Sequence, residues 1–219
     1  MNKFSPYFLR GKEIGKRVFI LGNSPSILLH DLSKLNGKLS IGMNASTLLE
    51  KKYGFISSYY CVSDKRFLSD INKKHMATDL VSKDTVRVLR SGISGDEKLK
   101  LHNKTIYIDS LGRDGFSFDL ASGFYFGSTT TMLAIQLAVW LGCKEIVLLG
   151  CDFNYKKTNP RFYSESKIAP DDALISVQVR NIANSVSLLK ERGVDVFNCS
   201  IDSMLRSYVK YEKFENLVN

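Results

Sequence analysis

The chain has 219 residues, of which 44% are hydrophobic and 24% charged, a composition typical of a globular protein with one large core. Its formal net charge of +9 favours an anionic partner such as a nucleotide, a nucleic acid or an acidic membrane surface. The basic residues are dispersed, which argues against nucleic acid, and no apolar run approaches the roughly 20 residues of a membrane span.

The first predicted strand is Arg17–Leu21, an apolar and β-branched run. The turn Gly22–Ser26 follows it, and a helix to about Leu35 is expected to begin there. Pro25 suits the first position of this helix and Ser24 suits its cap. A strand, a glycine-led turn and a helix start can bind an anion, because free backbone N–H groups point out of the helix. The turn lacks the GxGxxG and Walker patterns, so its position carries the prediction.

Two more strands are each predicted to end at a polar corner. Leu39–Gly42 is followed by Asn44, which is expected either to cap the next helix or to hydrogen-bond a base or ribose. Tyr59–Val62 is followed by Asp64, which occupies a cap position before a helix to about Lys74. Further strands are predicted at 85–89 and 105–108.

The segment Phe126–Tyr155 is the central unit of the chain. A helix that begins after Gly127, Ser128 and Thr129 is apolar on nearly every side, so it is predicted to be buried. A short buried strand, 146–149, follows it and ends at the polar and aromatic cluster 150–155. Ligands of open α/β sheets bind where strands end and helices begin, so both ends of this unit are predicted to form one site.

The segment 156–172 has two prolines and no clear period, the composition of a mobile active-site loop. A long helix at 173–192, a last strand at 194–197 and a C-terminal helix within 201–219, from Met204 to about Leu217, are predicted after it. Strands and helices that alternate in this way indicate an α/β fold, with a doubly wound, mostly parallel sheet and helices on both faces. We expect one nucleotide-binding domain over residues 1–219.

The four cysteines are far apart and form no CxxC pair, so we expect buried, reduced thiols and no zinc site: Cys61, Cys143, Cys151 and Cys199. Reduced thiols favour a cytoplasmic protein. Aromatic and basic residues within 4–10 offer peripheral contact with the inner face of the membrane, although packing against the domain is the simpler role. The three histidines are expected on the surface: His30, His75 and His102.

Three segments appear in a characteristic order: GNSPS after the first strand, GSTTTMLAIQLAVWLGCKEIVLLGCDFNY in the middle, and DVFNCSIDSML near the end. Together they resemble the bacterial sialyltransferases of glycosyltransferase family 42. They also resemble the related domain of motility-accessory-factor glycosyltransferases and archaeal 6-hydroxymethylpterin diphosphokinases. The resemblance covers about Arg17 to Leu205, and it implies a Rossmann-like, GT-A-like variant with a nucleotide bound across the sheet ends.

The resemblance also implies which residues bind the nucleotide. In the sialyltransferases, the first turn approaches the CMP phosphate and ribose, an asparagine after the second strand binds the nucleotide, and a serine at the start of the buried helix contacts CMP. With the corner residues beside them, the expected nucleotide-binding set is Gly22, Asn23, Ser24, Ser26, Asn44, Asp64, Gly127, Ser128 and Thr129.

The catalytic residues carry over less directly. Two tyrosines beyond the GxDF turn stabilise the departing phosphate in that family; here Tyr155 and Tyr163 can supply phenol groups in a shifted register. The family's catalytic histidine is replaced by Ser176, so a carboxylate would have to act as the base. The candidates are Asp152, Asp171, Asp172 and Glu165, and the expected catalytic set is Asp152, Tyr155, Tyr163 and Asp172.

Three functions remain open. The first is a glycosyltransferase that moves an acidic ulosonic acid, such as a sialic acid, from a CMP-activated donor to a surface polysaccharide or glycolipid, with no tightly bound cofactor and no metal. The second is an ATP-dependent diphosphokinase of the 6-hydroxymethylpterin type, with Mg²⁺ held by Asp64 and Asp152. The third is a nucleotide-binding module without catalysis. A homo-oligomer is compatible with each of them.

Overall fold

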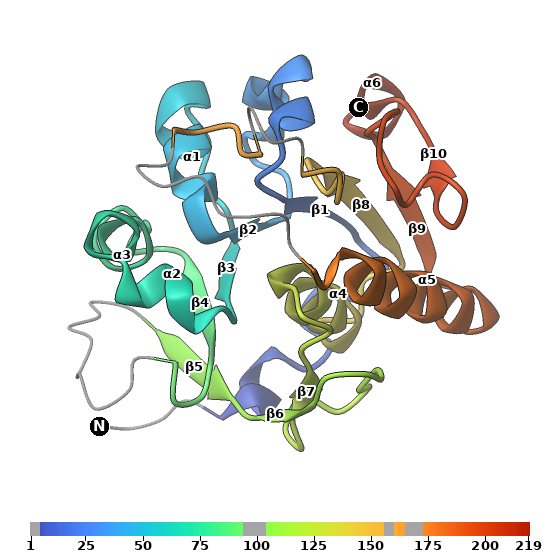
Figure 1. Cartoon of the computed structure of the whole chain (residues 1–219), viewed down its shortest axis with the longest axis horizontal. Coiled ribbons are helices and arrows are strands. Elements are labelled where there is room, and N and C mark those ends of the chain that lie inside the picture. The colour runs from blue at the N-terminus through green and yellow to red at the C-terminus, as the bar shows by residue number, and fades with distance from the viewer. Residues whose placement is uncertain (1–4, 94–103, 156–159, 165–172) are drawn as a thin grey trace.

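The fold is described from a computed structural model, in which residues 5–93, 104–155, 160–164 and 173–219 are placed. Its centre is an eight-stranded sheet in the order β10-β9-β8-β1-β2-β3-β4-β5, in which every neighbouring pair is parallel (Figure 1). The strands are β1 Arg17–Leu21, β2 Ser40–Met43, β3 Tyr59–Val62, β4 Val86–Arg90, β5 Thr105–Ile108, β8 Glu145–Leu149, β9 Asp195–Asn198 and β10 Lys210–Tyr211. A separate two-stranded sheet joins β6, Ser110–Gly112, to β7, Phe124–Tyr125.

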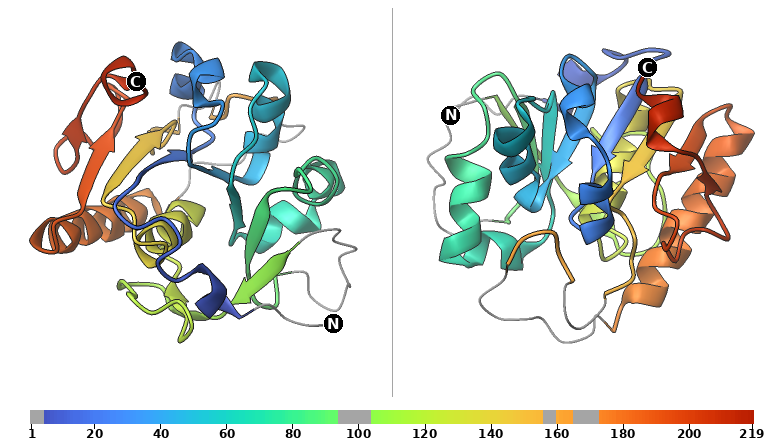
Figure 2. Two further views of the ribbon diagram at one scale, coloured as in Figure 1. Left: turned by 180° about the vertical axis from the view of Figure 1, so that it is seen from behind. Right: turned by 90° about the horizontal axis from the view of Figure 1, so that it is seen from above.

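Helices cover both faces of the sheet, as Figures 1 and 2 show. One apolar cluster packs α4, α5 and the amino-terminal helix η1 against one face, and two other clusters pack the remaining helices against the opposite face. The α-helices are α1 Thr47–Tyr53, α2 Lys65–Ser69, α3 Ile71–Thr78, α4 Thr130–Trp140, α5 Ile175–Glu191 and α6 Phe214–Leu217. The 3₁₀ helices are η1 Pro6–Leu9, η2 Pro25–Leu29, η3 Leu32–Leu35 and η4 Asn44–Ser46. The predicted doubly wound α/β fold is therefore confirmed.

The strand order reverses between β1 and β8. The chain enters the sheet at β1, adds β2 to β5 on one side, and then returns to β8 on the other side of β1 before β9 and β10. Ligands of open α/β sheets bind outside the carboxyl ends of the strands at such a reversal. The corners that follow β1 and β8 therefore flank the expected crevice.

The central helix α4 is buried, as its sequence predicts. All residues from Thr130 to Ala138 are buried. Gly142, with a left-handed φ of 88°, follows the last turn of the helix and stops it from continuing. A helix inside the domain needs no polar face, because both its sheet side and its outer side contact protein. The start of α4 is thus held rigidly beside the sheet.

The predicted helices after β1 and β3 are each divided in two. The first becomes η2 and η3, because the Asp31 side chain accepts a hydrogen bond from the Ser33 amide and begins a new turn. The second becomes α2 and α3, because Asp70 caps α3 by accepting from the Asn72 amide. Short acidic side chains compete in this way with continuous helix.

The predicted C-terminal helix within 201–219 is wrong. The Ser203 hydroxyl donates to the carbonyl of Cys151 or Asp152, at 3.1 and 3.2 Å, which ties this segment to the end of β8. The chain then pairs with β9 as the short strand β10, and only Phe214–Leu217 is helical. Contacts with distant strands therefore override the local helical pattern.

All four cysteines are buried and free, as predicted. Burial raises the pKa of each thiol, to about 12 for Cys143, Cys151 and Cys199. In the described part of the chain, no helix combines the length and the apolar character that crossing a membrane requires.

Candidate functional site

The corners after β1 and β8 are in direct backbone contact. The Gly22 amide donates to the Leu149 carbonyl at 2.7 Å, and the Ser24 amide donates to the Gly150 carbonyl at 2.9 Å. A Cβ atom at Gly22 would lie 2.2 Å from the Gly150 carbonyl oxygen, so only glycine permits this approach. The close contact makes the two corners one structural unit.

Asn23 fixes the neighbouring corner after β2. Its side-chain amide donates to the Met43 carbonyl and accepts from the Ala45 amide, both at 3.0 Å, and the residue is only 8% exposed. The Asn23 carbonyl in turn accepts from the Phe162 amide at 3.0 Å. The side chain that was expected to bind the nucleotide is therefore already occupied in holding the crevice wall.

Three residues at these corners have a left-handed backbone: Asn44 with φ of 51°, Ser128 with 59° and Phe153 with 55°. They are the only residues other than glycine with positive φ among those the structure places, and all three line the same cavity. Such conformations cost about 1–3 kcal/mol each and cluster at functional sites. The strain lies after β2, before α4 and after β8.

The amino terminus of α4 opens into this cavity. Thr129 caps the helix by accepting from the Thr131 amide, and Thr130 contacts the Ser63 hydroxyl at the end of β3, at 3.1 Å. Within the described residues, the Ser128 hydroxyl is buried without a hydrogen-bond partner, as is the Asn44 side-chain carbonyl. The amino terminus of a helix of this length attracts anions. Buried polar atoms without protein partners occur where a ligand or water completes their hydrogen bonds.

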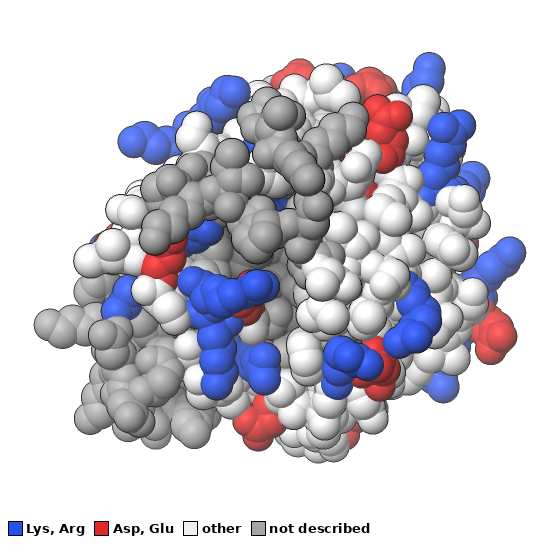
Figure 3. All heavy atoms as spheres, in the orientation of Figure 1, with Lys and Arg blue, Asp and Glu red and all other residues white. Residues whose placement is uncertain are grey.

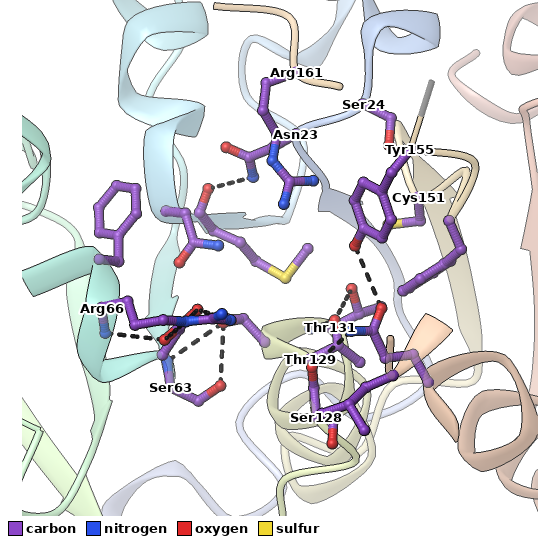
Figure 4. A pocket seen from close by; sticks show the side chains of 18 of the residues that line it. Asn23, Ser24, Ser63, Arg66, Ser128, Thr129, Thr131, Cys151, Tyr155 and Arg161 are labelled. Carbon is purple, nitrogen blue, oxygen red and sulfur yellow. Dashed lines mark hydrogen bonds and ion pairs between the residues drawn. The ribbon is translucent and has the colours of Figure 1, made fainter. Parts of the chain in front are cut away.

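The cavity has a volume of about 700 Å³, within the range of small-molecule sites. Figure 3 shows a hollow on this face, and Figure 4 shows side chains that line it. The predicted site residues that line it are Asn23, Ser24, Asn44, Asp64, Ser128, Thr129, Asp152, Tyr155 and Tyr163. Gly22, Ser26 and Gly127 do not line it, and Asp172 lies outside the described residues, as do Asp171 and Glu165.

Ser26 does not line the cavity, but its side chain hydrogen-bonds Asp152, which does. Its hydroxyl donates to Asp152 Oδ1 at 2.6 Å and contacts the Ser200 hydroxyl at 2.7 Å. Ser24 occupies the N-cap position of η2 as predicted, but its hydroxyl makes no capping hydrogen bond and instead accepts from the Asp152 amide at 3.3 Å. Asp152 is thus held at the cavity wall by Ser26 and Ser24, and Ser200, which was not predicted as a site residue, contacts Ser26 from behind.

Gln178 connects the predicted tyrosine to the start of α4. Tyr155 donates its phenol hydrogen to Gln178 Oε1 at 3.3 Å, and Gln178 Nε2 donates to the Ser128 carbonyl at 3.0 Å. The Arg161 guanidinium lies 4.6 Å from the centre of the Tyr155 ring. Gln178 is 2% exposed and was not predicted. Its signal in the sequence is a polar residue within the long helix at 173–192.

Asp64 does not form a metal site with Asp152. It caps α2 through the Arg66 amide and makes a bidentate pair with the Arg66 side chain. The two aspartates follow β3 and β8, which are three strand spacings apart, or about 14 Å at the strand ends. No group of three or more His, Cys, Asp or Glu side chains able to hold a metal ion occurs in the described residues.

Cations outnumber carboxylates on the cavity wall. The basic residues are Lys65, Arg66, Lys73, Arg90 and Arg161, whereas Asp64 and Asp152 are the acidic residues among the described lining. Lys65, Arg66, Lys73 and Arg90 were not predicted as site residues, because they lie on separate strands and helices. The adjacency of β3 and β4 brings most of them together. The cavity therefore suits an anionic ligand.

His30 is half-buried rather than on the surface, so that prediction is wrong. Its ring centre lies 5.2 Å from that of Phe214, and its Nε2 atom is buried without a partner among the described residues. Burial lowers the pKa of His30, while the charges of Glu215 and Asp152 act in the opposite direction. His75 is exposed, as predicted, and His102 lies outside the described residues.

Several solved structures share this fold, among them a glycosyltransferase and a sialyltransferase. The MAf glycosyltransferase from Magnetospirillum magneticum AMB-1 has a TM-score of 0.63 at 14% identity; the match covers 92% of this chain but only 34% of the Magnetospirillum chain. The sialyltransferase CstII from Campylobacter jejuni, solved in complex with a substrate analogue, cytidine-5′-monophosphate, has a TM-score of 0.56 at 18% identity over 90% of this chain and 85% of its own.

The sequence comparison gives the family. No protein of curated function matches the chain. A family model described as 6-hydroxymethylpterin diphosphokinase MptE-like matches residues 1–158, which include β1 to β8 and most of the cavity corners. Together with the two structures, this match confirms the superfamily that the sequence motifs indicated, and the chain belongs to the MptE-like family.

Proposed function

We propose that the chain is a glycosyltransferase that takes an acidic sugar, such as a sialic or related ulosonic acid, from a CMP-activated donor and transfers it to a surface glycan. The observation that carries the proposal is the convergence of the β1 and β8 corners with the amino terminus of α4 on one basic cavity. The two structural neighbours, one a glycosyltransferase and one a sialyltransferase in complex with cytidine-5′-monophosphate as a substrate analogue, support the reaction class.

In this proposal, the nucleotide phosphate lies at the start of α4, where backbone amides and the helix dipole favour negative charge. Arg161 and the Tyr155 phenol would stabilise the charge that develops on the departing CMP. Asp152, which lines the cavity and has no hydrogen bond to Oδ2 among the described residues, would accept the proton of the acceptor hydroxyl.

Binding measurements test this proposal. CMP at about 100 times its Kd should stabilise the protein by about 2.7 kcal/mol, and thus raise Tm by about 5–11 °C, without added metal. Arg161→Gln should weaken CMP binding at least about tenfold, because it removes a charge-assisted contact. Arg206→Gln, at an exposed position outside the cavity, is the matched control and should leave binding unchanged. Absence of any CMP response would refute the proposal.

Diphosphate transfer from ATP is the second candidate, because the family model is described by that activity. The described carboxylates do not fit a shared Mg²⁺ site, since Asp64 is paired with Arg66 and lies three strands from Asp152. Stabilisation by ATP that requires Mg²⁺, with none by CMP, would favour this function. The same thermal-shift series with CMP, CDP, ATP and ATP plus Mg²⁺ therefore distinguishes the two.

A further inference from the structure

We propose that the cavity contains a second anion-binding subsite, at the ends of β3 and β4, which takes a carboxylate or phosphate beyond the first phosphate of the nucleotide. The proposal relies on the proposed function only in placing a nucleotide at the β1 and β8 end. Four cationic side chains lie at this second end: Lys65, Arg66, Lys73 and Arg90. Figure 3 shows basic side chains gathered beside the hollow, over the positions of α2 and β4 in Figure 1.

Only part of the positive charge at this end is paired with a described carboxylate. Asp64 forms its pair with Arg66. In the described parts of the chain, no ion pair joins Lys65 or Arg90 to a carboxylate. Lys65 and Arg90 therefore add positive charge to the cavity wall that is not paired with a described carboxylate.

Arg90 is held in position by an aromatic contact. Its guanidinium lies 5.0 Å from the centre of the Phe126 ring, and both residues line the cavity. A guanidinium that stacks on a ring keeps its N–H edge for a planar oxyanion such as a carboxylate or phosphate. Because Arg90 ends β4 and Phe126 precedes α4, the stack joins the two ends of the crevice.

The subsite adjoins the start of α4, where the proposed function places the phosphate, and extends from there toward β4, away from the β1 and β8 corners. The ends of β1 and β3 are two strand spacings apart, about 10 Å, and the long Lys and Arg side chains shorten this distance. Ser63 and Thr130, which are in contact at 3.1 Å, connect the two ends. The substrate should therefore carry two anionic groups, or two anionic substrates should share the cavity.

The test compares the double variant Lys65→Gln/Arg90→Gln with the matched control Lys51→Gln/Arg206→Gln, whose Lys and Arg are exposed and outside the cavity. Titrations in about 0.15 M salt limit long-range effects of charge. Four probes are used: CMP, CMP-N-acetylneuraminate, ATP, and inorganic phosphate added to CMP-saturated protein. They place the second anion on the sugar, on the nucleotide or on a separate substrate.

The double variant should bind CMP within about twofold of wild type but lose about tenfold or more in at least one of the other three titrations. Equal losses for CMP and for the other probes, equal losses in the control variant, or no loss with any probe would overturn the subsite. If no nucleotide binds, the subsite is tested by titration with pyrophosphate alone. A tenfold weaker pyrophosphate affinity in the double variant then supports the subsite although the proposed function has failed, and an unchanged affinity or no binding to wild type refutes it.

Discussion

Gly22→Ala tests directly whether the contact between the β1 and β8 corners forms the site. The new Cβ would lie 2.2 Å from the Gly150 carbonyl oxygen, 2.6 Å from its carbonyl carbon and 2.8 Å from Cys151 Sγ. The first two of these atoms belong to the backbone, so no side-chain rotation can relieve the contact. The corners must separate by roughly 1 Å to restore ordinary van der Waals distances.

The expected cost follows from the bonds that such a movement disturbs. Overpacking of a core costs about 1–3 kcal/mol, and the two hydrogen bonds between the corners contribute about 1 kcal/mol each. Because these contributions overlap, we expect a loss of about 3 kcal/mol in the free energy of unfolding. For a chain of this size, that loss lowers Tm by about 6–12 °C. The response to CMP should also fall, since the amino terminus of α4 and the β1 corner no longer hold their relative positions.

Urea unfolding and thermal shift with and without CMP measure both effects. Gly112→Ala is the matched control, because its φ is not positive and the added Cβ would meet only the Tyr125 ring, at 3.8 Å. The control should be neutral or slightly stabilising, since alanine restricts the unfolded chain. If Gly22→Ala were within about 0.5 kcal/mol of wild type and bound CMP normally, the corners would not be in the contact described.

Other variants examine the remaining contacts. Asn23→Ala removes two buried hydrogen bonds and should lower the free energy of unfolding, measured in urea, by about 2–3 kcal/mol. Asn36→Ala, at an exposed position, should change it little, and equal losses in the two variants would refute the role of Asn23 in holding the corner after β2. Asp152→Asn should slow donor hydrolysis at least about hundredfold with CMP affinity retained, whereas full activity would exclude it as the base. The free energy of unfolding should fall as the pH falls below 6.5. Burial lowers the pKa of His30 in the folded state, so the unfolded chain binds the proton more readily than the folded protein does. His30→Gln should therefore flatten the stability curve between pH 7.5 and 5.5, and parallel curves would contradict this.

The sequence was sufficient to predict the fold because the relevant signals are local. The runs Arg17–Leu21, mostly apolar and β-branched, and Tyr59–Val62, aromatic and apolar, form β1 and β3 with those same bounds. The helix after Thr129 is apolar on all sides and is accordingly buried. Alternation of such elements leaves few topologies other than a parallel, doubly wound sheet.

The site was less predictable because its contacts are between distant segments. Asn23 and Gln178 hold the cavity walls through partners 20 and 50 residues away, and a polar side chain in the sequence does not reveal its partner. Arg90 and Lys65 join one wall only because β3 and β4 are neighbours. The C-terminal helix failed for the same reason, since Ser203 is tied to the end of β8.

The positions of strain and of support coincide in this crevice. Two of the three left-handed corner residues lie beside a buried polar side chain that fixes them: Asn23 bonds both neighbours of Asn44, and Gln178 bonds the Ser128 carbonyl. Without these clamps, the corners could relax to a less costly backbone. The fold therefore uses hydrogen bonds from one segment to maintain strained backbone in another. This arrangement has a physical purpose only if the exact position of those backbone groups matters, as it does when they bind a phosphate.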